Sequence, residues 1–199
     1  MQKFERVAGI IERYAGKDLR MLDIGCRRKG LQPFVQHLGT YHGADLFQSG
    51  TVEYVGDFAL GLPVEDQAYD VTLALDVIEH TTDMVVALDE MLRVTRRFGI
   101  VVLPNHAHWT FRLNLLFTGR IGDKFDIQYP LNLDRHRWFT TAVQSDAFIR
   151  DYTAARGFGL TILDSGLGRF GPIIERSIGR LWPNLFNKNQ MYLISRDPV

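Results

Sequence analysis

The stretch LRMLDIG (residues 19–25) decides the predicted fold. It is a short, mostly apolar run that ends at a glycine, which is typical of a buried strand followed by a turn. The chain then predicts a turn over 27–30 and a helix over 31–38. Before the strand, apolar side chains recur at helical spacing over 3–15 and predict an amphipathic helix.

Strands and helices continue to alternate after this unit. Apolar runs predict strands over 41–46, 52–55, 70–76 and 100–103. Between the last two, a capping cluster and a helical apolar pattern predict a helix over 84–97, with Gly99 as its stop signal. This alternation is typical of a doubly wound, Rossmann-like α/β sheet with parallel strands and helices on both faces.

The regular pattern lapses beyond residue 105. We expect apolar insertions over 106–130 and 166–187, after the fifth and sixth strands. A helix over 140–156 and a strand over 158–163 lie between them, and an antiparallel last strand follows over 190–196. No linker divides the chain, so 1–199 is predicted to be one domain with a more regular half, 19–105, and a less regular half, 106–199.

The composition is that of an ordinary globular protein. Of the 199 residues, 46% are hydrophobic, and 23 basic residues balance 23 acidic ones. A neutral chain lacks the basic footprint of nucleic-acid binding, so no nucleic-acid partner is expected. The single cysteine excludes an internal disulfide, and no apolar run is long enough for a signal peptide or a membrane span. These features predict a cytoplasmic protein.

Acidic residues stand at the ends of four predicted strands. They are Asp23, Asp45, Asp57 and Asp76. An aspartate in such a place is often only a cap or turn residue, but the carboxyl ends of parallel strands meet at one edge of the sheet. Asp23 and Asp45 are 22 residues apart, close to the spacing at which an acidic residue binds ribose hydroxyls.

The sequence resembles the class I S-adenosylmethionine-dependent methyltransferases, and within them the small-molecule, type 11-like subgroup. The resemblance rests on motifs in the family's order: MLDIGCRRKGL (21–31), Asp45, GDFALGLPVEDQAYDVTLALDVIEH (56–80) and DRHRWFT (134–140). It is strong over 19–105, which would be the cofactor-binding half. It is looser over 106–199, which would be the substrate-side half.

The resemblance implies a cofactor, S-adenosyl-L-methionine, and a role for each matching residue. Asp23, Gly25 and Cys26 would pass close to its methionine part, which Asp76 and Val77 would border. Asp45 would hold the ribose hydroxyls, and Leu46 would line the adenine. Asp57 would accept from the adenine amino group, and Phe58 would donate backbone contacts beside it. Glu79 and His80 would lie at the mouth of the site. The implied reaction is methyl transfer to a small-molecule or lipid- or saccharide-linked acceptor.

The first loop departs from the family pattern. Arg27 and Lys29 stand where the second and third glycines of D-x-G-x-G-x-G are usual, and glycine permits close approach and unusual backbone angles. The alternative is therefore a non-catalytic protein that keeps the fold and serves as a partner or regulatory subunit. Other nucleotide motifs fail: Leu31 and Gln32 replace the P-loop Lys and Ser/Thr, and Arg27 replaces the second glycine of a dinucleotide fingerprint.

Histidines are the candidates for a general base. His80, His106 and His136 carry imidazoles, which titrate near neutrality and would remove a proton from an acceptor hydroxyl. Each could equally be structural. No metal site is predicted, because His106 and His108 have no acidic or cysteine partner at ligand spacing. Cys26 is expected to be a small buried residue rather than a nucleophile.

Two apolar segments remain, around 109–117 and 173–186. They are expected to form a lid or part of the core. Because arginines flank them, peripheral contact with a membrane or a lipid-linked substrate is the alternative. The expected partner is a small-molecule substrate, and the oligomeric state is left open.

Overall fold

Strand β1 (Leu19–Ile24) lies near the middle of a seven-stranded sheet with the order β3-β2-β1-β4-β5-β7-β6. The computed structural model describes residues 2–48, 52–122, 124–125, 127, 129–130, 134–163, 179 and 181–196. The other strands are β2 (Gly39–Asp45), β3 (Tyr54–Val55), β4 (Tyr69–Leu75), β5 (Thr95–Pro104), β6 (Gly159–Leu163) and β7 (Asn189–Ser195).

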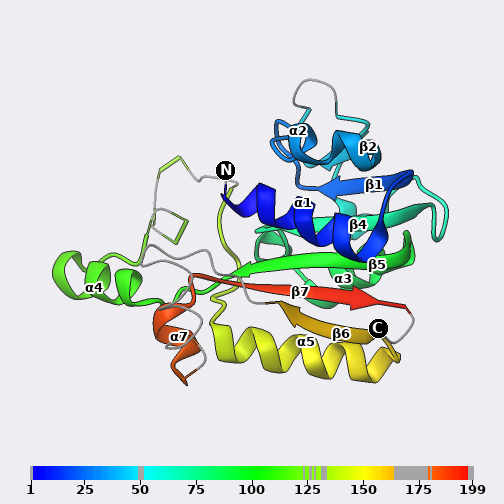
Figure 1. Ribbon diagram of the computed structural model, residues 1–199. Coiled ribbons are helices and arrows are strands. Elements are labelled where there is room, and N and C mark those ends of the chain that lie inside the picture. The colour runs from blue at the N-terminus through cyan, green and yellow to red at the C-terminus, as the bar shows by residue number, and fades with distance from the viewer. Residues whose placement is uncertain are drawn as a thin grey trace.

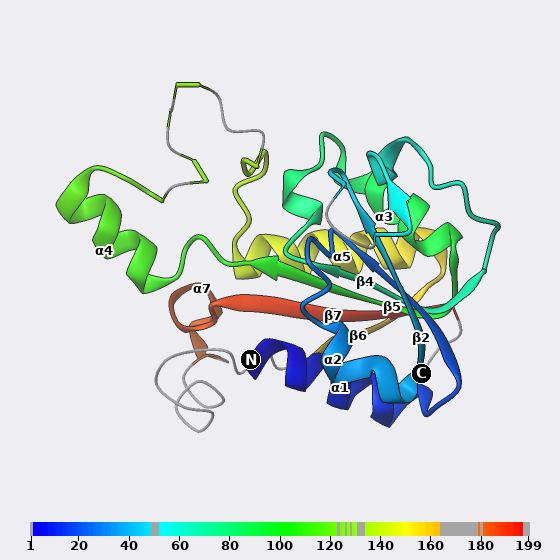
Figure 2. The ribbon, with the colours of Figure 1, turned by 90° about the horizontal axis from the view of Figure 1, so that it is seen from above.

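Helices cover both faces of this sheet (Figures 1 and 2). The helices are α1 (Gln2–Ala15), α2 (Gln32–Val35), α3 (Met84–Arg93), α4 (Trp109–Thr118), α5 (Ala142–Arg156) and α7 (Pro183–Phe186), with 3₁₀ turns η1 (Gln36–Leu38), η2 (Phe58–Leu60) and η3 (Ile78–His80). One core joins the sheet to α1 and α2, and the other joins it to α3 and α5.

The side chains of β5 show how the sheet separates the two cores. Phe98, Ile100 and Val102 belong to the core under α1, whereas Val101 and Leu103 belong to the core under α3 and α5. Successive strand residues point to opposite faces, and here both faces are covered, so the strand carries no polar side chain from residue 98 to its end. The predicted doubly wound α/β sheet is confirmed.

The predicted antiparallel last strand is confirmed as well. Strand β7 pairs antiparallel with both of its neighbours, β5 and β6, whereas the pairs among β1, β2, β3, β4 and β5 are parallel. Helix α4 occupies the first predicted insertion, after β5. The second insertion, 166–187, lies mostly outside the described residues, which include α7 from it.

The predicted helix over 84–97 is wrong in its last turn. Helix α3 ends at Arg93, and β5 begins at Thr95. Thr95 is fully buried, and its Oγ1 lies 2.6 Å from Thr72 Oγ1 and donates to the Met91 carbonyl at 2.7 Å. Gly99 is not a helix stop: it lies within β5, where a Cβ atom would come 2.8 Å from Met91 Cε. The glycine therefore lets α3 pack closely on the strand.

Smaller differences concern the lengths of elements. The predicted helix over 31–38 is divided into α2 and η1, and the strand predicted over 52–55 is reduced to β3. The helical segment ends at Gly39, whose φ of 149° lies in the region that favours glycine. No helix among the described residues is both long and apolar enough to cross a lipid bilayer.

Candidate functional site

Two adjoining cavities open at the carboxyl ends of β1, β2 and β4. The chain adds β2 and β3 on one side of β1 and β4 and β5 on the other, so the cavities lie where the strand order reverses, the usual ligand site of such sheets. The smaller cavity measures about 390 Å³ and the larger about 1190 Å³. Gly25, Arg27, Asp76 and His80 line both.

The nine residues predicted to bind the cofactor all line these cavities. The smaller one is lined by Gly25, Asp45, Leu46, Asp57, Phe58, Asp76 and Val77, and the larger one by Asp23, Gly25, Cys26 and Asp76. The structure thus brings residues from four strand ends into one crevice. Their contact with a cofactor stays a prediction.

The first loop follows the course of a glycine loop although two of its residues are basic. Gly25, Arg27 and Lys29 have φ of 70°, 48° and 54°, in the left-handed region that costs a non-glycine residue roughly 1–2 kcal/mol. A side chain at Gly25 would overlap Val77. The backbone amide of Arg27 donates to Asp45 Oδ2 at 2.7 Å, so the loop and the end of β2 are joined.

Of the two basic residues at the family's glycine positions, Lys29 lines neither cavity, whereas Arg27 lines both, as does the adjacent Arg28. The Lys29 side chain is 8% exposed and lies behind the loop, where its Nζ donates to Glu53 Oε1 at 2.6 Å. The other Glu53 oxygen accepts from the Gly43 amide at 2.6 Å. Arg27 points outward and donates from Nη2 to Asp134 Oδ2 at 2.7 Å.

Asp45 and Asp57 are fixed by backbone amides. In Asp45, Oδ2 accepts from Arg27 and Oδ1 accepts from the Phe47 amide at 3.0 Å. Asp57 caps η2, and its Oδ1 accepts from the Ala59 amide at 3.0 Å. Each carboxylate is oriented by its own turn and lines the smaller cavity.

Asp23 and Asp76 differ in how much charge they present. Asp23 is 5% exposed and accepts a hydrogen bond from the Tyr41 hydroxyl. Burial raises its pKa to about 7, although Tyr41 and Lys3 act in the opposite direction. Asp76 has φ of 59° and accepts from Lys3 Nζ at 2.7 Å and Asn189 Nδ2 at 3.1 Å. Asp76 is therefore already paired with a cation, whereas burial disfavours the ionised form of Asp23.

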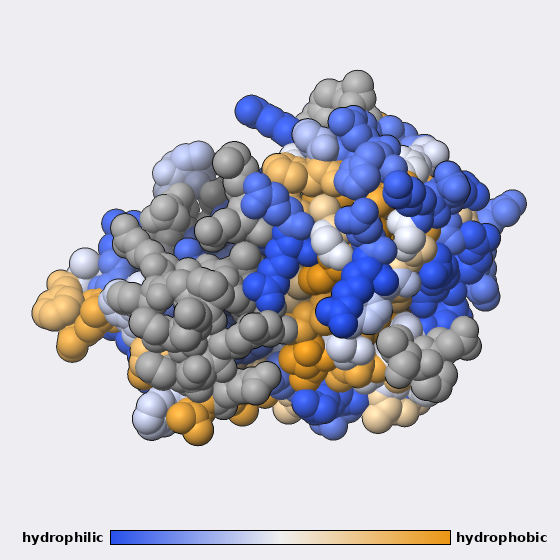
Figure 3. Space-filling view, viewed as in Figure 1, coloured by the Kyte–Doolittle hydropathy of each residue, from blue (hydrophilic) through white to orange (hydrophobic). Residues whose placement is uncertain are grey.

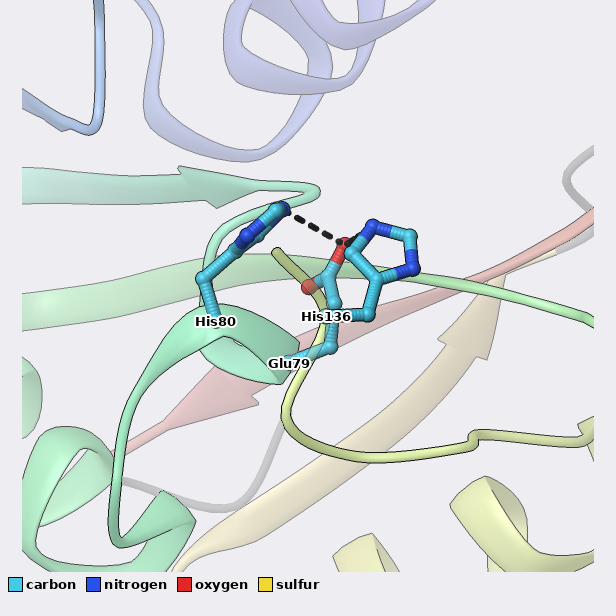
Figure 4. A group of neighbouring side chains, drawn as sticks. All are labelled: Glu79, His80 and His136. Atoms are coloured by element: carbon cyan, nitrogen blue, oxygen red, sulfur yellow. Dashed lines mark ion pairs between the residues drawn. The ribbon is translucent and has the colours of Figure 1, made fainter. Parts of the chain in front are cut away.

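Two of the three candidate histidines, His80 and His136, lie beside Glu79 on the wall of the larger cavity (Figure 4). Nε2 of His136 lies 3.7 Å and Nε2 of His80 lies 3.9 Å from Glu79 Oε1. The ring centroids of His80 and His106 lie 4.5 Å and 4.7 Å from that of His136. His80 and His136 line the larger cavity, whereas His106 is 3% exposed and lines neither cavity.

These histidines are weaker bases than the sequence argument assumed. Burial lowers the pKa of His80, that of His106 to about 4, and that of His136 to about 3, where the neighbouring His80 and His106 add to the effect. Burial, with Asp76 nearby, raises the pKa of Glu79 to about 8. Burial thus favours the uncharged form of Glu79 and of the three histidines, and titration near neutrality does not describe His106 or His136.

The DRHRWFT segment (134–140) holds this cluster in place. The amides of Arg137 and Trp138 donate to the Glu79 carbonyl at 2.9 and 3.2 Å. The Trp138 indole donates to the Thr81 carbonyl at 2.9 Å, and His80 Nδ1 lies 2.9 Å from the Arg135 carbonyl. These bonds place His136 on the wall of the larger cavity and Asp134 and Arg137 on that of the smaller one, while residues 137–139 stay exposed.

Several residues at the site were not predicted. Lys3 reaches Asp76 from α1, Glu53 anchors Lys29, and Asp134 pairs with Arg27 and Lys124. Asp134 begins the DRHRWFT motif, but Lys3 and Glu53 lie outside every motif of the resemblance. Charge at the first turn of a helix or in a loop is so common that no local signal marks these residues.

Solved structures with similar folds are methyltransferases for the most part. The magnesium protoporphyrin IX methyltransferase from Synechocystis PCC 6803, with bound SAH, is 14% identical over 98% of this chain and 83% of its own, with a TM-score of 0.63. A SAM-dependent methyltransferase from Archaeoglobus fulgidus is 16% identical over 98% and 94%, with a TM-score of 0.56. The [4+2]-cyclase SpnF is 17% identical over 98% and 82%, also with a TM-score of 0.56.

The fold and the site define the class: this is a class I S-adenosylmethionine-dependent methyltransferase fold. Within that class, residues 6–194 match the family described as "Methionine biosynthesis protein MetW", and the chain belongs to this family. No curated protein matches the sequence at a significant level.

Proposed function

We propose that this protein binds S-adenosylmethionine in the smaller cavity and transfers its methyl group to a small-molecule or lipid- or saccharide-linked acceptor in the larger one. The observation that carries the proposal is Asp45, held at the end of β2 by two amides with its carboxylate lining the smaller cavity. Bound SAH in the Synechocystis neighbour supports the choice of cofactor.

The residues of the site would act mainly by binding and orientation. Bound S-adenosylmethionine would supply an already activated methyl group, so alignment of the acceptor accounts for most of the catalysis. Asp45 would accept from the ribose hydroxyls and Asp57 from the adenine amino group. Asp76, fixed by Lys3 and Asn189, would border the opening between the cavities, with His80 and His136 on the acceptor side.

The alternative is a non-catalytic partner or regulatory subunit. Its sequence argument was that Arg27 and Lys29 narrow the first loop, but Lys29 is buried against Glu53 and Arg27 points outward to Asp134. What favours the alternative is the family itself, whose description gives a biosynthetic role and no reaction. The SpnF neighbour also carries a different reaction on a similar fold.

Titration calorimetry with S-adenosylhomocysteine tests the proposal, with NADH as the control ligand. Asp45→Ala removes an acceptor of two charged hydrogen bonds, worth about 1.5–3 kcal/mol each, so affinity should fall at least about 100-fold. Asp151→Ala, an exposed aspartate on α5, is the matched control and should bind like the wild type. If Asp45→Ala binds normally, the site is misplaced. If the folded wild type does not bind, the non-catalytic alternative replaces the proposal.

A further inference from the structure

Glu79 is buried without the partners that a buried carboxylate requires. Its side chain is 0% exposed, and neither oxygen has a hydrogen-bond partner among the described residues. The two lysines that act on it, Lys3 and Lys124, are already paired with Asp76 and Asp134. A buried carboxyl group without hydrogen bonds costs about 1–3 kcal/mol even when it is uncharged, and more when it is ionised, so its retention needs an explanation.

Two imidazoles face the same carboxylate oxygen from different parts of the chain. His80 comes from η3 and His136 from the DRHRWFT segment, and one donor atom from each of the three residues lies within 4.8 Å of the others. Figure 4 shows the three side chains turned toward one another. We propose that Glu79, His80 and His136 bind a divalent transition-metal ion on the wall of the larger cavity.

The geometry is close to that of a metal site. Metal–nitrogen and metal–oxygen bonds of about 2.0–2.2 Å place ligand atoms about 3.0–3.4 Å apart at tetrahedral or octahedral angles. The observed nitrogen–oxygen separations of 3.7 and 3.9 Å would contract by about 0.5 Å on binding. The ligating nitrogens of His80 and His136, which lie within 4.8 Å of each other, must also approach to about 3.0–3.4 Å, and this requires rotation of the two rings.

The surroundings of His80 favour metal binding through Nε2. Its Nδ1 lies 2.9 Å from the Arg135 carbonyl and 3.4 Å from Asp134 Oδ1, so Nδ1 carries the proton and Nε2 keeps its lone pair. A ligating histidine usually donates its other N–H to a carbonyl or carboxylate in this way. His136 Nδ1 has no hydrogen-bond partner in the described part of the chain, so no such bond opposes rotation of that ring.

The donor set indicates which ions fit. Two imidazoles and one carboxylate suit Zn²⁺, Co²⁺, Fe²⁺ or Mn²⁺ better than Mg²⁺ or Ca²⁺, which prefer oxygen ligands. Three protein ligands leave coordination positions open, as catalytic sites do. These positions face the larger cavity, where water or an oxygen of the acceptor would complete the shell. This last step, unlike the metal site, rests on the proposed function and favours acceptors with a hydroxyl or carboxylate oxygen.

Titration of chelator-treated protein without a histidine tag tests the site. Co²⁺ binding is followed by visible absorption and Zn²⁺ binding by calorimetry, both without S-adenosylhomocysteine. We expect one ion per chain. Even outer partners of metal ligands contribute about 10–100-fold to affinity, so Glu79→Gln and His136→Ala should each weaken binding at least about 10-fold. His37→Ala, an exposed histidine of η1, should leave it unchanged.

Each outcome decides the proposal. Circular dichroism first shows that the variants fold, and His80→Asn replaces a variant that does not. No Co²⁺ or Zn²⁺ binding by the wild type, or equal binding by wild type, Glu79→Gln and His136→Ala, overturns the metal site. Loss equal to that of the ligand variants in His37→Ala would also overturn it. Because S-adenosylhomocysteine is absent, failure of the metal site is distinguishable from failure of cofactor binding.

Discussion

Helices α3 and α4 have the same length but differ in how far their side chains are buried. In α3, Met84, Ala87, Leu88, Met91 and Leu92 are buried, whereas in α4 none of the ten residues is. Yet α4 has at least as many large apolar side chains: Trp109, Phe111, Leu113, Leu115, Leu116 and Phe117. The difference is spacing, because the α3 residues fall at i, i+3, i+4, i+7 and i+8, on one face.

This contrast separates the two halves of the molecule. Helix α3 packs on β4 and β5 and belongs to a continuous core. Helix α4 projects from the body in both ribbon views and carries an apolar end in the space-filling view (Figures 1, 2 and 3). Its apolar residues on all sides cannot meet one sheet. Helix α3 therefore contributes to the stability of the core, whereas α4 is available for a ligand, a membrane or a partner.

The largest expected difference in the free energy of unfolding is between leucine-to-alanine variants of the two helices. Leu88→Ala in α3 empties a fully buried position, and such changes lower the free energy of unfolding by about 2–5 kcal/mol. Leu116→Ala in α4 alters a side chain that is 74% exposed. This variant should change the free energy of unfolding by less than about 0.5 kcal/mol. Urea unfolding of both variants measures the difference.

The pair also tests the exposure of α4. If Leu116→Ala is as destabilising as Leu88→Ala, α4 is covered in solution, and the contrast between the two helices is wrong. Repeating the unfolding at several protein concentrations distinguishes cover by a second copy of the chain, because the stability of an oligomer depends on concentration.

The sequence predicts the cofactor half well because its signals are local. Asp23, Asp45 and Asp76 each lie in or directly after a buried strand, and parallel pairing brings such positions to one edge. The predicted helix over 84–97 is too long because basic residues such as Arg96 and Arg97 are typical of the last turn of a helix. Pairing of β5 with β4 and the bond from Arg96 to Asp70 outweigh that local preference.

The histidine cluster could not be predicted in the same way. Glu79 and His136 are distant in the sequence, and they meet only because the backbone of Arg137 and Trp138 donates to the Glu79 carbonyl. The expectation of no metal considered His106 and His108, which are close in sequence but whose rings the structure does not bring to Glu79. Long-range contacts of this kind follow from packing, which one sequence without relatives does not reveal.

An intermediate effect is expected at Asp70, at the start of β4. Its Oδ2 accepts from the Arg20 amide at 2.9 Å, and its Oδ1 accepts from Arg96 Nε at 3.0 Å. Asp70→Asn should lower the free energy of unfolding by about 1–3 kcal/mol, because it weakens charged hydrogen bonds in a buried place. Such a loss would show that the sheet depends on an ion pair at the start of β4, the end of the strand that is remote from the site.

The pH dependence of stability provides a second test of the role of Asp70. Burial acts to raise the pKa of Asp70, but the Arg20 amide and Arg96 outweigh it and lower the pKa below its usual value. The pKa of Asp70 is thus lower in the folded protein than the value of about 3.9 in the unfolded chain. The ionised carboxylate therefore stabilises the fold above that pH, and the stabilisation is lost as the pH falls. The difference between wild type and Asp70→Asn should therefore shrink between about pH 5 and pH 3, as urea unfolding across this range would show. A constant difference would contradict it.

The smallest effect is expected at Arg27, whose side chain joins the first loop to Asp134 in the other half. The ion pair is exposed, with Arg27 68% accessible, and such pairs contribute about 0.2–1 kcal/mol. Arg27→Gly loses this pair but relieves a φ of 48°, which costs a non-glycine residue about 1–2 kcal/mol. The new glycine also costs about 0.4–1 kcal/mol of conformational entropy; the losses and the gain then nearly cancel, so the free energy of unfolding should move by less than about 1 kcal/mol. Arg28→Gly is the matched control: Arg28 is exposed and is not among the positive-φ residues, so only the entropic cost of about 0.4–1 kcal/mol remains. Urea unfolding should thus find Arg28→Gly the less stable variant.

The opposite order of stability would contradict this prediction. If Arg27→Gly is the less stable variant, the ion pair with Asp134 holds residues 19–105 and 106–199 together, and the second half is less independent than the exposed α4 suggests.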